Sequence, residues 1–98
     1  MKHKDFLDDY LKLKHEAIKE LKSLLNRFPG RSVDLSEAAL FLNLCPGGAC
    51  GYDSWQVMCV TYEFILIENE YGGEYEAEYD DFSVLDLEMI MDNMPEPE

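Results

Sequence analysis

A long amphipathic segment that ends at Pro29-Gly30 is the feature that most restricts how this chain can fold. Its apolar residues recur at helical spacing: Leu7, Tyr10, Leu11, Ala17, Ile18, Leu21, Leu24, Leu25 and Phe28. Asp5 is placed to cap the start of this helix, and Lys22 and Arg27 near its end suit the helix dipole. Such a helix is a rod of roughly 35 Å. We expect it to support a sheet, or to meet a second copy of the chain in a homodimer.

The second strong pattern is a β-hairpin. Residues 55–71 are rich in Val, Ile, Tyr, Phe and Thr, and they predict one long strand. Gly72-Gly73 predicts a two-residue turn, and residues 74–79 alternate as a return strand. This register pairs Tyr75 with Glu70, Ala77 with Glu68 and Tyr79 with Leu66. The face predicted to be the core then carries Met58, Val60, Tyr62, Phe64, Leu66, Tyr75, Ala77 and Tyr79.

The other segments complete an α+β fold. Residues 31–44 carry both a strand signal and a helix-start signal, which a short strand followed by a helical turn or a second strand would satisfy. Residues 45–54 predict a glycine-rich loop. Ser83 and Asp86 predict a capping box for a short helix that Pro95 ends. We therefore expect one domain over 1–94, with a long N-terminal helix, a small antiparallel sheet dominated by one hairpin, a short C-terminal helix, and a disordered acidic tail over 95–98.

Charge is divided unevenly along the chain. All eight Lys and Arg residues lie at or before Arg31, whereas sixteen of the 21 acidic residues follow it, within a net charge of −13. A chain this acidic is a poor ligand for phosphates, so we expect neither direct nucleic-acid binding nor binding to anionic membranes. A basic protein surface is a more suitable partner.

Two further features favour a cytoplasmic location. No segment reaches the ~18 uninterrupted apolar residues of a membrane span, and no apolar run follows the basic start, so we expect no secretory signal. The three cysteines are an odd number, whereas secreted disulfide frameworks normally use an even one.

Cys45, Cys50 and Cys59 are the candidates for metal binding. Three thiolates together with His3 or His15 would suffice for four-coordinate zinc, and a thiol-coordinated metal protein is therefore one hypothesis. A second paired cluster is missing, and a buried Cys59 acting as a small apolar residue is the commoner arrangement. We therefore predict no cofactor and assign no metal site.

The chain also lacks the usual patterns of catalysis. Both histidines lie within the first 15 residues, and no serine or cysteine stands in a recognised nucleophile motif. The glycines of the 45–54 loop are not followed by the Lys-Ser or Lys-Thr of a phosphate loop. We expect a protein that is not an enzyme.

The acidic return strand is the main candidate for a functional surface. Alternation places Glu74, Glu76 and Glu78 on one face, roughly 6.7 Å apart. The full predicted partner-binding set is Glu63, Glu74, Glu76, Glu78 and Asp80. Three interpretations remain open: a solvated face that resists aggregation, a docking face for a basic protein, and a mimic of a nucleic-acid backbone that inhibits a DNA- or RNA-binding protein.

Overall fold

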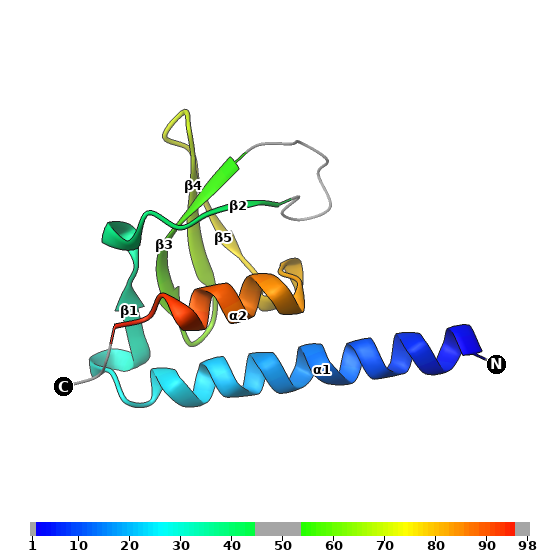
Figure 1. Ribbon diagram of the computed structural model, residues 1–98. Helices are drawn as coiled ribbons and strands as arrows, with labels where there is room; N and C mark the ends of the chain where they lie inside the picture. The colour runs from blue at the N-terminus through cyan, green and yellow to red at the C-terminus, as the bar shows by residue number, and fades with distance from the viewer. Residues whose placement is uncertain (1, 45–53, 96–98) are drawn as a thin grey trace.

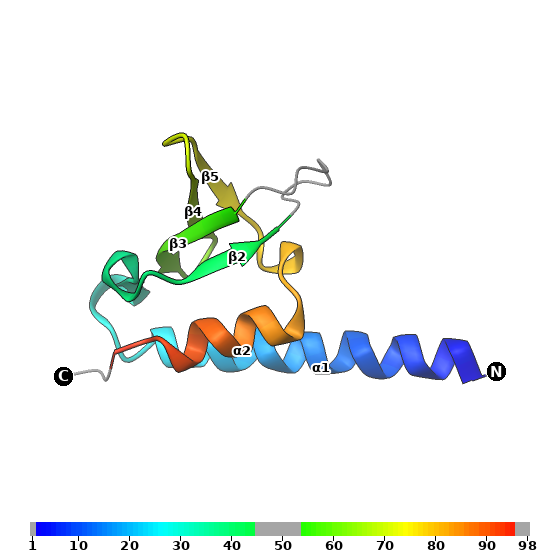
Figure 2. The ribbon, with the colours of Figure 1, turned by 45° about the horizontal axis from the view of Figure 1, so that its top comes forward.

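The computed structural model describes residues 2–44 and 54–95, which form two helices and a five-stranded antiparallel sheet. The α+β prediction is thus confirmed. Helix α1 spans Lys2–Leu25 and helix α2 spans Val84–Asp92. The strands are β1 (Ser32–Asp34), β2 (Phe41–Asn43), β3 (Ser54–Thr61), β4 (Ile65–Asn69) and β5 (Glu74–Ala77). Both helices lie side by side beneath the sheet (Figures 1 and 2).

Helix α1 is longer at its start and shorter at its end than predicted. It begins at Lys2, so Asp5 lies inside the helix and the prediction that Asp5 caps it is wrong. It ends at Leu25. The backbone N–H groups of residues 26–28 then donate to carbonyls three residues earlier, as in a 3-10 turn that ends at Phe28. Phe28 is extended because the residue before a proline is disfavoured in the α conformation. Gly30, with φ of 67°, then reverses the chain.

Only the second half of α1 packs against the sheet. Ala17, Leu21 and Leu25 are buried in the core, whereas Leu11 and Leu13 are 54% and 55% exposed. The N-terminal half projects past the rest of the protein (Figure 1). Self-association through this helix stays a prediction. Within the described chain, no helix has both the length and the apolar character needed to cross a bilayer.

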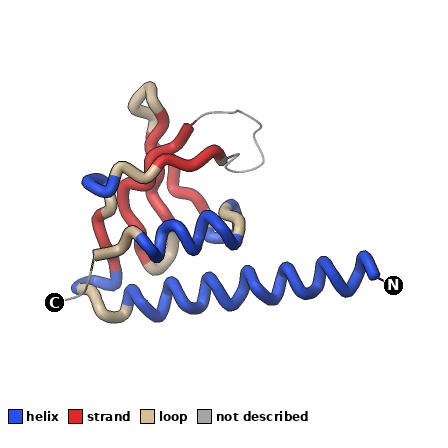
Figure 3. Tube along the Cα trace, viewed as in Figure 1, coloured by secondary structure: helices blue, strands red, loops and turns tan. Residues whose placement is uncertain are grey.

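Residues 31–44, whose sequence carries both strand and helix signals, form both strands and a short helix. β1 and β2 both pair antiparallel with β3, and a 3-10 helix at Ser36–Ala38 separates them. The sheet order is β1-β3-β4-β5, with β2 beside β1 along the same edge of β3. Figure 3 shows the strands gathered on one side of the two helices.

The long predicted strand is in fact two strands, β3 and β4. The chain turns at residues 62–64, where no glycine or proline marks the reversal. The Thr61 hydroxyl makes this turn: it donates to the carbonyl of Phe64 at 2.7 Å and accepts from the N–H of Phe64 at 3.0 Å. Side-chain hydrogen bonds of this kind replace backbone ones and permit a turn.

The second turn is longer than the predicted Gly72-Gly73. The Asn69 side chain accepts from the N–H groups of Tyr71 and Gly73, at 3.0 and 2.8 Å, and so closes a turn over residues 70–73. Ile67 therefore pairs with Tyr75, and Ile65 pairs with Ala77. The predicted register is wrong by an odd number of residues, which exchanges the two faces of β4.

The core follows from this register. Ile65 and Ile67 are fully buried although neither belongs to the predicted core face, while Leu66, which does belong to it, is only half-buried. Val60, Ala77 and Tyr79 are buried as predicted. Met58 leaves the predicted core face because the β3–β4 register shifts between Val57 and Cys59.

The closing helix agrees with its sequence signals. Asp86 N–H donates to the Ser83 hydroxyl at 3.1 Å, and Ser83 N–H donates to the Asp86 carboxylate at 3.2 Å. The predicted capping box is thus confirmed. Helix α2 ends at Asp92, before Pro95. The predicted 45–54 loop lies, except for Ser54, outside the described residues, as does the predicted tail beyond Pro95.

Candidate functional site

The face of the sheet that points away from the helices is the candidate site, and we call it the outer face. Paired residues of neighbouring strands share a face, so the register defines its members. They are Ser32, Asp34, Phe41, Asn43, Ser54, Gln56, Cys59, Thr61, Leu66, Glu68, Glu74 and Glu76. No Lys, Arg or His occurs on any of the five strands.

Carboxylates concentrate at the β4–β5 end of the outer face. Glu68 lies directly opposite Glu74, and Glu76 follows two residues later on the same strand. Like charges that face each other across strands destabilise a sheet. Near the other end, Asp34 stays ionised, since hydrogen bonds from the side chain and backbone of Ser36 hold the pKa of Asp34 below its ordinary value.

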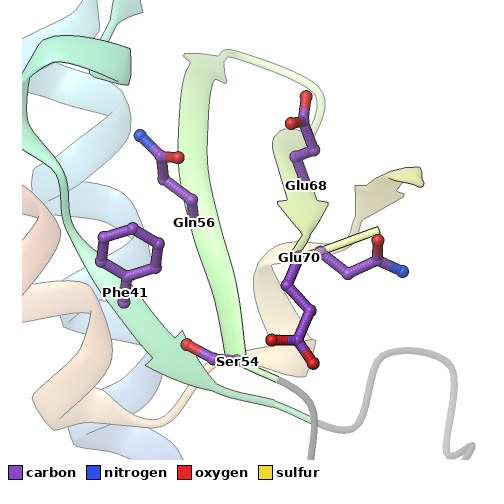
Figure 4. A pocket seen from close by; sticks show the side chains of 6 residues that line it. Phe41, Ser54, Gln56, Glu68 and Glu70 are labelled. Carbon is purple, nitrogen blue, oxygen red and sulfur yellow. The ribbon is translucent and has the colours of Figure 1, made fainter. Parts of the chain in front are cut away.

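A shallow depression lies on the outer face where β3 begins and β4 ends. Its volume is about 320 Å³, and its lining is Phe41, Ser54, Gln56, Glu68, Asn69 and Glu70. Figure 4 shows Phe41 and Gln56 on one side of β3, with Glu68 and Glu70 on the other. Phe41 is 57% exposed, and the Gln56 amide donates to the Ser36 carbonyl at 2.9 Å, which fixes its position. The outer face thus joins an exposed aromatic ring to an acidic rim.

The five acidic residues predicted as a partner surface fall into two groups. Glu74 and Glu76 lie on the outer face. Glu63, Glu78 and Asp80 instead line a second depression of about 360 Å³, together with His15, Ile18, Lys22 and Tyr79. β5 ends at Ala77, and Glu78 caps the 3-10 helix Tyr79–Asp81, so the predicted row of glutamates is shorter than expected.

The second depression brings basic groups of α1 close to acidic and aromatic ones. The Lys14 ammonium donates to the Asp80 carbonyl at 2.6 Å. The Lys22 ammonium lies 5.2 and 5.1 Å from the ring centres of Tyr62 and Tyr79, within the range of cation–π attraction. The Tyr79 hydroxyl donates to the Thr61 carbonyl, and burial raises the pKa of that hydroxyl. These contacts hold α1 against the sheet.

Of the three cysteines, Cys59 is the one that the structure describes. It lies on the outer face between Asp34 and Leu66 on the neighbouring strands. Cys45 and Cys50 lie outside the described residues, and so does the side chain of His3. Among the side chains that the structure describes, those of residues 9–44 and 54–95, no three His, Cys, Asp or Glu are grouped as a metal site.

The Cys59 thiol is expected to react slowly with alkylating agents. Burial, and then the negative charge of Asp34, raise the pKa of this thiol, so less of the reactive thiolate is present at a given pH. In a Cys45→Ser, Cys50→Ser background, the alkylation rate of Cys59 at pH 8 should be below that of a free cysteine peptide. Asp34→Asn should increase the rate. A rate equal to that of the peptide would show that Cys59 is neither shielded nor near a charge.

A second prediction concerns the facing pair Glu68 and Glu74. Glu74→Gln removes the repulsion and is expected to raise the free energy of unfolding by about 0.2–1 kcal/mol, as measured by urea denaturation at low salt. Glu88→Gln, on an exposed position of α2, removes the same charge elsewhere and serves as the control. The difference between the two variants should shrink at high salt. A stability gain for Glu88→Gln as large as that for Glu74→Gln would refute a local repulsion.

Glu68, at the β4–β5 end of the outer face, is not among the residues predicted from the sequence to bind a partner. The predicted turn is too short and therefore places Glu68 on the core side, whereas the structure pairs it with Glu74 on the outer face. Asn69, one residue later, carried the signal for the longer turn, since asparagine side chains commonly accept backbone hydrogen bonds in turns. Comparison of the chain with protein-family models, curated proteins and solved structures gave no match.

Proposed function

We propose that the protein is a non-enzymatic interaction module whose outer face binds a positively charged surface of another protein. The observation that carries the proposal is the facing of Glu68 and Glu74 on a side of the sheet that neither helix covers. A basic partner would turn this repulsion into attraction. Folded proteins rarely gain stability from such an arrangement, so its presence is consistent with a role in binding.

The apolar part of the outer face supports the same proposal. Phe41 is more than half exposed, and Leu66 is half-buried beside the glutamates. Interfaces combine a few aromatic or apolar anchors with a polar, charged rim. The charged rim would steer a basic partner, and Phe41 would supply contact area once the partner has docked.

The nucleic-acid mimic proposed from the sequence draws less support. It needs a regular row of anions. Only Glu74 and Glu76 lie on β5, while Glu78 belongs to the following turn. A mimic would also have to displace DNA or RNA from its partner, which a competition assay with the captured protein measures.

The test is capture of partners on immobilised protein at low and high salt. Three proteins are compared: the wild type, an outer-face variant (Glu68→Gln, Glu74→Gln, Glu76→Gln) and a helix variant (Glu16→Gln, Glu20→Gln, Glu88→Gln). Both variants lose the same charge, and all six glutamates are exposed or partly exposed. We expect the wild type and the helix variant to retain a basic protein that salt elutes and that the outer-face variant fails to hold. Retention that is indifferent to salt, or lost equally in both variants, would contradict the proposal.

A further inference from the structure

Strand β5 forms an open edge of the sheet. It pairs with β4 on one side, and in the described part of the chain no strand pairs with its other side. Glu74, Tyr75 and Glu76 are all exposed. Open edges carry backbone groups that can accept another strand.

The register shows which backbone groups of β5 face outward. Asn69 N–H donates to the Gly73 carbonyl at 2.9 Å, so these two residues form a hydrogen-bonded pair. Such pairs alternate with non-hydrogen-bonded ones along an antiparallel ladder. Ile67 with Tyr75, and Ile65 with Ala77, are therefore the next hydrogen-bonded pairs. It follows that the N–H and C=O groups of Glu74 and Glu76 point away from β4, toward the open edge.

This alternation dictates the side chains of an added strand. An antiparallel strand that hydrogen-bonds to Glu74 and Glu76 places its own residues directly opposite them, with side chains on the outer face. Those two positions favour Lys or Arg. The residue between them points to the inner face beside Tyr75, which is 38% exposed and whose ring centre lies 6.3 Å from that of Trp55. That position favours an apolar side chain.

A second copy of this protein is a poor occupant of the edge. Pairing β5 with β5 would set glutamates opposite glutamates, in addition to the repulsion already present between Glu68 and Glu74. None of the five strands that the structure describes carries Lys or Arg, so none of them supplies the missing charge. The complementary strand must come from a different, basic protein.

We propose that β5 binds an extended segment of its partner as an additional antiparallel strand, with a basic–apolar–basic sequence facing residues 74–76. This inference rests on the proposed function and names the partner's chemistry and binding mode. Backbone hydrogen bonds supply the geometry, and charge pairing with Glu74 and Glu76 supplies the selectivity.

The probe is a blocked heptapeptide of alternating Lys and Val, titrated into the full-length chain. In the proposed pairing the lysine N–H groups face β5 and the valine N–H groups face solvent. Methylation of the backbone nitrogens of the lysine residues should therefore weaken binding about tenfold or more, because it removes hydrogen bonds to the edge of β5. Methylation of the backbone nitrogens of the valine residues should leave the affinity within about twofold of that of the unmethylated peptide. The unmethylated peptide should also slow hydrogen exchange at the amides of Glu74 and Glu76.

The outcomes separate this inference from the function on which it rests. Glu74→Gln and Glu76→Gln should each weaken peptide binding about two- to fivefold. If these variants weaken binding but both methylated peptides bind alike, the edge pairing is wrong and the acidic docking face stands. If the peptide affinity changes neither in the glutamate variants nor with salt concentration, the proposed function fails as well. Absence of saturable binding at millimolar peptide also overturns the edge pairing.

Discussion

Replacing Ile67 by alanine is expected to lower the free energy of unfolding by about 2–5 kcal/mol, whereas the same change at the neighbouring Leu66 should cost about 1 kcal/mol. Ile67 is fully buried on the inner face, so truncation leaves a cavity. Leu66 is half-buried on the outer face, where solvent can occupy the space. Urea denaturation of the two variants measures the difference. Equal slopes of the unfolding free energy against urea concentration would confirm that both variants unfold in the same reaction.

This pair of variants also tests the sheet register. The register predicted from the sequence puts Leu66 in the core and Ile67 outside, and so expects the opposite order of stabilities. Similar losses at both positions, or a larger loss at Leu66, would contradict the observed pairing of Ile67 with Tyr75. Because the outer face is defined by that pairing, the stability result bears directly on Glu68 as well.

Phe82→Ala is expected to be the most damaging single substitution of the C-terminal segment, with a loss of about 3–5 kcal/mol. Phe82 is fully buried and directly precedes the cap of α2, while Leu87, one turn into that helix, is also fully buried. Truncation would open a cavity where α2 joins the sheet. A domain of this size has only about 5–15 kcal/mol of total stability, so much of it would be lost.

The matched control for Phe82→Ala is Leu85→Ala. Leu85 lies in the same helix but is 67% exposed, and its truncation should change the stability by about 0.5 kcal/mol or less. Thermal or urea unfolding of both variants distinguishes them. Comparable losses would mean that α2 contributes through its helical surface rather than through packing of Phe82.

Local sequence signals predicted the closing helix and the mixed structure of residues 31–44 well. The capping box of Ser83 and Asp86 involves residues three apart, so its chemistry is complete within the segment. The same holds for the strand-then-helix signals of residues 31–44, which form β1, a 3-10 helix and β2 in turn. Asp5 failed as a cap because nothing in the three preceding residues prevents the helix from starting earlier.

The register could not be predicted as securely because it depends on side-chain hydrogen bonds. Thr61 and Asn69 each close a turn through their own side chains. No glycine marks the first turn, and the second turn extends beyond the Gly72-Gly73 pair that predicts it. These two turns flank β4 and together decide which of its faces enters the core. Glu74 and Glu76 lie on the same face in the predicted and the observed register, because they share a strand. Glu68 lies on the neighbouring strand, so the wrong register places it on the opposite face.

The binding affinity of the two equal-charge triple variants for a captured partner tests the central claim most directly. If the outer face is the docking surface, the Glu68→Gln, Glu74→Gln, Glu76→Gln protein should bind about tenfold or more weakly than the wild type while remaining at least as stable. The Glu16→Gln, Glu20→Gln, Glu88→Gln protein should bind as the wild type does. An equal loss of affinity in both variants would show that net charge, rather than this face of the sheet, attracts the partner.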